Sequence, residues 1–101
     1  MLDRLADLLL WPGRVRRFAV ATAPADVLMQ SSLVLRGLGA GISRLDLDAG
    51  TLEARLAVGG LLRLRAEPQG EGSHVVIDVE GRDWGGAARV LASELERGGA
   101  A

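Results

Sequence analysis

The feature that most constrains the fold is an alternation of apolar and polar residues between Ile42 and Glu80. A period of two is typical of a strand with one face on a core and the other in water. Four successive segments show it, with apolar members at Leu45/Leu47, Leu52/Ala54/Leu56, Leu62/Leu64/Ala66 and Val75/Ile77/Val79. Turns that contain glycine separate these segments, so the pattern predicts an antiparallel meander.

Turn chemistry and cross-strand charge predict how the first strands of the meander pair. In the first hairpin, a two-residue turn at Gly50-Thr51 places Gly at the first central position of a type II′ turn. This register sets Asp46 opposite Arg55 on the outer face, which is a favourable cross-strand pair. In the second hairpin, a loop over residues 58–60 keeps the apolar residues of both strands on one face.

In the last hairpin, residues 68–73 are predicted to form the loop. This loop sets Glu67 opposite His74. The outer face of the meander then consists mostly of Asp, Glu and Arg, with Val76 as the exception. Such a face is expected to be wet, so the helices should cover the sheet from the other side only.

Three further elements complete the predicted fold. Residues 14–21 alternate as a strand with Phe18 pointing inward, and a helix is predicted over 24–36 because Pro fits a first helical turn. A last helix begins at Asp83 as N-cap and ends at Gly98. The sequence thus predicts an α+β fold, with a five-stranded mainly antiparallel sheet, two helices packed on one face and a short N-terminal helix. The first strand lies next to the last strand or next to the strand after the helix, and the sequence leaves both positions open.

Length and composition limit the classes of protein to which the chain can belong. Its 101 residues predict a single domain over 1–101, with an N-terminal helix and turn at 1–13 and a sheet-plus-helices core at 14–98. The formal net charge of -1 argues against a nucleic-acid binder, and the absence of Cys excludes disulfides. No apolar run approaches the roughly 18 residues of a membrane span, and the N-terminus lacks the basic start of a signal peptide. We therefore expect a cytoplasmic protein without stable membrane insertion.

The N-terminal segment is a candidate partner-binding element. Its apolar side chains form one stripe of a short predicted helix and its end: Leu2, Leu5, Leu9 and Trp11. This helix either packs on the core of its own domain or docks on a protein partner, a second subunit included. Its acidic polar face makes a membrane surface the weaker alternative. The arginines at 14, 16 and 17 form either a solvated strand edge or a contact for an anionic partner.

No group of residues in the sequence predicts catalysis, a metal site or a cofactor. His74 is the only histidine and Cys is absent, so a zinc site is not expected. As a general base His74 would need a nucleophile, but its neighbour Ser73 points to the opposite face of a strand. We expect His74 to be a surface partner of Glu67, and an enzyme with His74 as its base is the third interpretation. The glycine-rich run at 37–41 follows a helix, which reverses the order that a phosphate loop requires.

The order of elements resembles that of the START and polyketide-cyclase superfamily, the helix-grip fold. The likeness is carried by the segment Ala23-Pro24-Ala25-Asp26-Val27-Leu28 after the first strand and by a closing helix with a Trp/Ala/Leu stripe. The chain is also similar to small bacterial domains of unknown function that enter their last strand through Gly-Ser-x-Val, as at Gly72-Ser73-His74-Val75. The resemblance covers residues 15–97, although the superfamily has six strands after the first helix where four are predicted here. It implies an apolar ligand between the long helix and the sheet, near Leu45, Leu47, Trp84, Leu91 and Leu95.

Two functions from different classes fit these observations best. The first is a small cytoplasmic non-enzymatic interaction module that associates with itself through the N-terminal helix or an exposed sheet edge. The alternative is a carrier or sensor of a small apolar ligand or lipid, held in a cavity between helix and sheet.

Overall fold

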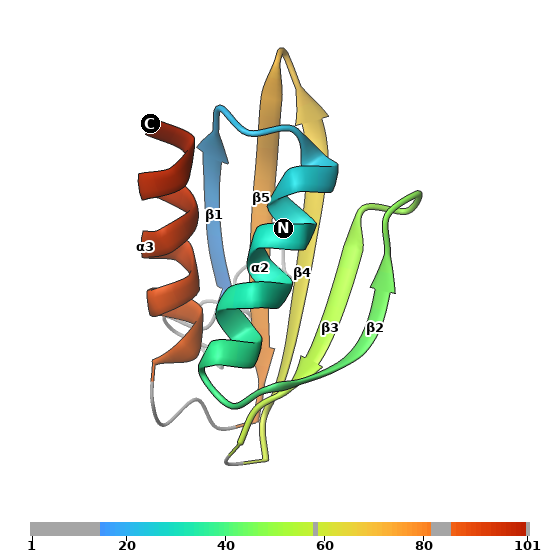
Figure 1. Cartoon of the computed structure of the whole chain (residues 1–101), viewed down its shortest axis with the longest axis vertical. Helices are drawn as coiled ribbons and strands as arrows, with labels where there is room; N and C mark the ends of the chain where they lie inside the picture. The colour runs from blue at the N-terminus through green and yellow to red at the C-terminus, as the bar shows by residue number, and fades with distance from the viewer. Residues whose placement is uncertain (1–14, 58, 82–85, 101) are drawn as a thin grey trace, which may run out of the picture.

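The computed structural model describes residues 15–57, 59–81 and 86–100. Within them the elements follow the order β1 (Val15–Val20), α2 (Pro24–Gly37), β2 (Gly41–Asp46), β3 (Thr51–Arg55), β4 (Leu61–Gln69), β5 (Gly72–Glu80) and α3 (Ala87–Ala100). The predicted α+β class is confirmed, with a five-stranded antiparallel sheet and both described helices on one of its faces (Figure 1). The helix predicted over 1–13 lies outside the described residues.

The strand order is β1-β5-β4-β3-β2, so the first strand lies next to the last. This order settles the position that the sequence left open. Phe18 of β1 stands opposite Val75 of β5 and packs against the core, as the alternation predicted. Figure 1 shows α3 beside β1 and α2 across the middle of the sheet.

The β4–β5 hairpin has the predicted register. Glu67 lies opposite His74, and Arg63 lies opposite Asp78. The strands run further toward the turn than expected, since Gln69 still pairs with Gly72. Two independent patterns, apolar alternation and charge, agree on this register, which explains why it could be predicted.

The register predicted for the β2–β3 hairpin is wrong. Asp46 pairs with Thr51 instead of Arg55, and residues 47–50 form the turn. The Asp46 carboxylate accepts a hydrogen bond of 3.0 Å from the Ala49 amide, and its carbonyl accepts one of 2.9 Å from Gly50. An Asp side chain that bonds the backbone of its own turn therefore outweighs the type II′ preference. A bulge between Ile42 and Arg44 interrupts the pairing further along β2.

The β3–β4 loop begins one position earlier than predicted. The Leu56 amide donates a hydrogen bond of 2.8 Å to the Gly60 carbonyl and closes the loop there. The register consequently sets Glu53 opposite Arg63, so opposite charges face each other across the two strands. The inward and outward faces are preserved, because the register moves by two positions.

The core lies between the sheet and the two helices. Helix α2 contributes the fully buried Val27, Leu28 and Leu35, and α3 contributes Leu91 and Leu95. The inward positions of the strands supply most of the others: Leu52, Ala54, Leu62, Leu64, Ala66, Val75, Ile77 and Val79. The single apolar face that the alternation predicted is therefore the face that the helices cover.

The ends of the helices follow the predictions only in part. Helix α2 begins at Pro24 after an Ala23 N-cap that makes no side-chain hydrogen bond. Helix α3 continues to Ala100, so the prediction that Gly98 ends it is wrong. The predicted N-cap Asp83 lies outside the described residues.

Candidate functional site

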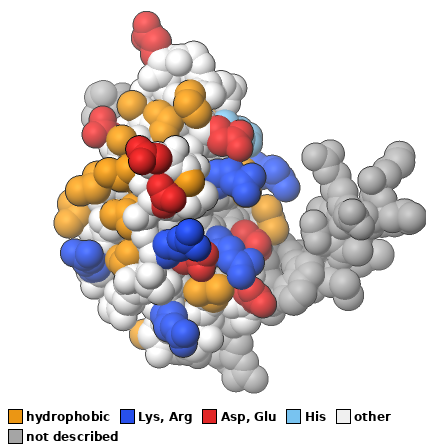
Figure 2. Space-filling model, turned by 90° about the vertical axis from the view of Figure 1, so that its right-hand side faces the viewer, with side chains coloured by type: hydrophobic (Ala, Val, Ile, Leu, Met, Phe, Trp, Pro, Cys, Tyr) orange, Lys and Arg blue, Asp and Glu red, His pale blue; other side chains and the backbone are white. Residues whose placement is uncertain are grey.

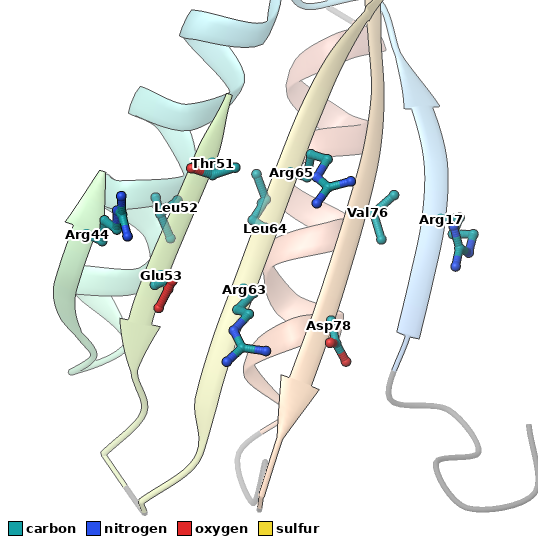
Figure 3. Close-up of a pocket in the computed structure, with 10 residues that line it drawn as sticks. All are labelled: Arg17, Arg44, Thr51, Leu52, Glu53, Arg63, Leu64, Arg65, Val76 and Asp78. Atoms are coloured by element: carbon teal, nitrogen blue, oxygen red, sulfur yellow. The ribbon is translucent and has the colours of Figure 1, made fainter. Parts of the chain in front are cut away.

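The open face of the sheet, which no described helix covers, carries a hollow of about 570 Å³ (Figure 3). Every strand contributes to its lining. Its charged residues are four arginines and two acids: Arg17, Arg44, Arg63, Arg65, Glu53 and Asp78. This face is thus the polar surface that the meander predicted, with the expected Val76 among its lining.

One row of residues across the open face alternates in charge. The strand registers set Asp78 beside Arg63, Arg63 beside Glu53, and Glu53 beside Arg44. Opposite charges on adjacent strands stabilise each other by up to about 1 kcal/mol. The ion pair that Arg63 makes is with Glu80, whose carboxylate lies 3.4 Å from its guanidinium, so the row alternates in charge by register, and it ends with Arg44 at the edge of the sheet.

In the neighbouring row of the open face, positive charges are not matched by acids on the adjacent strands. Arg17 and Arg65 flank Val76 from the two adjacent strands. A guanidinium nitrogen of Arg65 lies 3.8 Å from the Glu67 carboxylate, and both side chains are more than half exposed. Ion pairs this exposed contribute little to stability.

The basic cluster expected at 14, 16 and 17 is divided between the two faces of β1. Arg17 lies on the open face, whereas Arg16 stands opposite the inward Ile77 and buries its Nε atom without a hydrogen-bond partner. Arg14 lies outside the described residues. The two described arginines therefore do not form one anion-binding surface.

The residues predicted to line a ligand cavity are not brought together. Leu91 and Leu95 are buried in the core under α3, which packs over β1 and β5. Leu45 and Leu47 belong to β2 and its turn at the opposite edge of the sheet, and both are exposed. The alternation predicted Leu47 on the inward face of a strand, which is wrong, because β2 ends at Asp46 and Leu47 is the first residue of the turn. Trp84 lies outside the described residues.

The predicted partner-binding residues also lie outside the part of the chain that the structure describes: Leu2, Leu5, Leu9 and Trp11. His74 stands opposite Glu67, as expected. The adjacent Ser73 is fully buried and donates a hydrogen bond of 2.6 Å to the Thr22 carbonyl. Across residues 15–57, 59–81 and 86–100, no three His, Asp or Glu side chains are placed to hold a metal ion.

Exposed large apolar side chains gather on a surface that the sequence did not predict. They come from the outer side of α2, from its C-cap and from β2 with its turn: Met29, Leu33, Leu38, Leu45 and Leu47. We call this set the α2–β2 surface. Their exposed fractions are 49%, 68%, 42%, 36% and 48%. Figure 2 views the molecule from the side of β2 and shows hydrophobic side chains over one half of this face.

The orientation of α2 explains why Met29 faces the β2 side. Gln30 donates a hydrogen bond of 3.3 Å from its Nε2 to the Glu94 carbonyl of α3, so this flank of α2 faces α3. Met29 precedes Gln30 by one residue, or about 100° around the helix, and the outward-facing Leu33 lies between them, so Met29 is on the flank away from α3. Leu33, one turn further along, points away from the core. Leu38 is the C-cap residue of α2, and it is exposed because the helix ends at Gly37.

Sequence spacing held a signal for this surface. Met29 and Leu33 are four residues apart and off the stripe of Val27, Leu28 and Leu35, so they share a second apolar face of the helix. A helix with apolar residues on two faces is typical of one that contacts more than its own core.

No protein-family model and no curated protein matches this sequence. Among the residues that the structure describes, neither helix has the length and apolar character required to cross a membrane.

Proposed function

We propose that this chain is a non-enzymatic interaction module that associates with itself through the α2–β2 surface. The observation that carries the proposal is that all five exposed large hydrophobic side chains of the described residues lie on α2, its C-cap, β2 and the β2 turn. Surface apolar residues are normally scattered over a protein, and their concentration on two neighbouring elements favours a protein–protein contact.

The energetics favour association over exposure of this surface. Burying one large apolar side chain contributes about 1.5–3 kcal/mol. A symmetric dimer would bury the group twice, which offsets the loss of translational and rotational freedom on association. The edge of β2 adds to the surface, because in the described sheet β2 has β3 as its only neighbour.

Sedimentation velocity over a range of protein concentrations tests the proposal. We expect the parent protein to form a dimer and Met29→Asp to be monomeric, because the new carboxylate would be buried in the contact. Met29 is 49% exposed in the single chain, so this variant should keep the circular dichroism of the parent. The matched control is Ser93→Asp, which adds the same charge at an exposed position of α3 and should still dimerise.

A parent protein that stays monomeric at every concentration would refute self-association. A variant lacking residues 1–13 separates the two candidate interfaces. If this deletion abolishes the dimer and Met29→Asp does not, the N-terminal segment is the interface, and the α2–β2 surface is not.

A further inference from the structure

The outer edge of β2 presents opposite charges on one face and an apolar residue on the other. Arg44 stands opposite Glu53 and lines the hollow of the open face (Figure 3). Leu45 stands opposite the fully buried Leu52, so it belongs to the helix-covered face. Asp46 follows on the same face as Arg44, because side chains alternate along a strand.

We propose that β2 pairs in antiparallel fashion with β2 of a second copy, about a twofold axis at Leu45. The two five-stranded sheets then join edge to edge into one continuous sheet. This inference rests on the self-association proposed above and specifies its partner, strand and register.

Charge selects this register. With the axis at Leu45, Arg44 of each copy lies opposite the partner's Asp46, which gives two ion pairs. An axis at Arg44 would set arginine opposite arginine, and an axis at Asp46 would set two carboxylates opposite each other, both destabilising. An axis between residues would pair side chains from different faces of the sheet.

The pairing also continues a pattern already present within one chain. The row Asp78, Arg63, Glu53, Arg44 alternates in charge and ends at the edge with a cation. The partner's Asp46 is the acid that this alternation lacks. A self-complementary edge of this kind is what an isologous contact requires.

Apolar contacts form on the other side of the joined sheet. The two copies of Leu45, each 36% exposed in the single chain, meet on the helix-covered face. Met29, on the flank of α2 that faces away from α3, lies on the same side. The bulge between Ile42 and Arg44 limits the regular pairing to a few residues, so the contact depends on this apolar layer.

A charge-reversal series tests the ion pairs. Arg44→Asp and Asp46→Arg each place like charges opposite one another twice in the dimer, and each should raise the dissociation constant about tenfold or more. When these two variants are mixed, every facing pair is again of opposite charge, so a heterodimer should form at concentrations where neither variant dimerises alone. Native mass spectrometry resolves the two masses and detects it.

Cysteine cross-linking tests the register independently of these charges. Residues directly opposite in an antiparallel pair have Cα atoms about 4.5–5.5 Å apart, within reach of a disulfide. The chain contains no Cys, so Leu45→Cys should form a disulfide-linked dimer under mild oxidation. Ser43→Cys is the matched control and should remain unlinked, because Ser43 lies two positions from the axis and its two copies are not opposite each other.

The outcomes distinguish this inference from the proposed function. If the parent dimerises but Leu45→Cys does not cross-link, or cross-links no faster than Ser43→Cys, the β2 register is wrong while self-association stands. Asp46→Arg also removes the hydrogen bond from the Ala49 amide that closes the turn. If the mixture forms no heterodimer although both variants keep the circular dichroism of the parent, the ion pairs are refuted. If the parent is monomeric, both proposals fail.

Discussion

Ser73 joins the start of β5 to the segment that follows β1. Its side chain is fully buried, and its Oγ donates a hydrogen bond of 2.6 Å to the carbonyl oxygen of Thr22. Ser73 stands opposite Val20 at the last pair of the β1–β5 ladder. The hydroxyl thus extends the contact between two distant parts of the chain beyond the backbone pairs.

We expect Ser73→Ala to lower the free energy of unfolding by about 1–2 kcal/mol, because the Thr22 carbonyl loses a partner in a partly buried position. Urea denaturation measures the change. Ser93→Ala, at an exposed position of α3, is the matched control and should shift stability by less than about 0.5 kcal/mol. Equal effects for the two variants would show that the buried hydrogen bond contributes nothing.

At the scale of elements, the β1–β5 junction leaves no room for a side chain at Gly72. A Cβ atom added there would collide with the backbone carbonyl oxygen of Val20. The end of a flexible side chain could move aside, but the Val20 carbonyl belongs to the backbone of β1. It can give way only if β1 and β5 move apart.

Gly72→Ala should therefore destabilise the fold by about 1–3 kcal/mol, as overpacking does. Gly37→Ala should instead raise the free energy of unfolding by up to about 1 kcal/mol. Gly37 is helical, and a new Cβ there meets nothing within 4 Å. Thermal and urea unfolding of both variants check the two signs. A Gly72→Ala protein as stable as the parent would contradict the close approach.

Of the three hairpins, the β4–β5 hairpin is the one whose register could be predicted. Apolar alternation and the Glu67–His74 pairing agree on the β4–β5 register, and the structure has it. The β2–β3 register was wrong, because the Asp46 side chain closes the turn, and several turn types suit the same residues. The place of β1 depends on contacts across the whole chain, which no local pattern encodes.

The candidate surface was harder to predict than the fold. Leu33 fits a helix on any face, and its exposure is decided by how α2 packs on the sheet and on α3. Leu45 lies on the predicted face but at an edge where no helix covers it fully. The exposure of these side chains is thus decided by tertiary packing, which an alternation pattern does not predict.

At the scale of the whole molecule, strand pairing and burial decrease from the centre of the sheet to its β2 edge. Strand β5 lies between β1 and β4, while β2 pairs with β3 alone within the described sheet. Val75 and Ile77 of β5 are fully buried, whereas Leu45 of β2 is exposed. Local opening costs least free energy where backbone hydrogen bonds and apolar contacts are fewest.

The rates of amide hydrogen exchange should therefore rise from β5 to β2. In dilute solution we expect the amides of β5 to exchange slowest, at a rate set by global unfolding, and those of β2 to exchange fastest among the strands. Mass spectrometry of peptides covering residues 41–46 and 72–80 measures the contrast. Uniform protection of all five strands at low protein concentration would contradict it.

The neighbouring positions of β1 and β5 also matter while the protein is being made. Strand β1 leaves the ribosome first of the described elements and can pair only after β5, which is the last strand to be synthesised. At about 5–20 residues per second, this interval lasts on the order of seconds. During that time β1 has no strand to pair with, and Phe18 and Val20 cannot pack against the completed core. The nascent chain therefore exposes an apolar strand until β5 emerges.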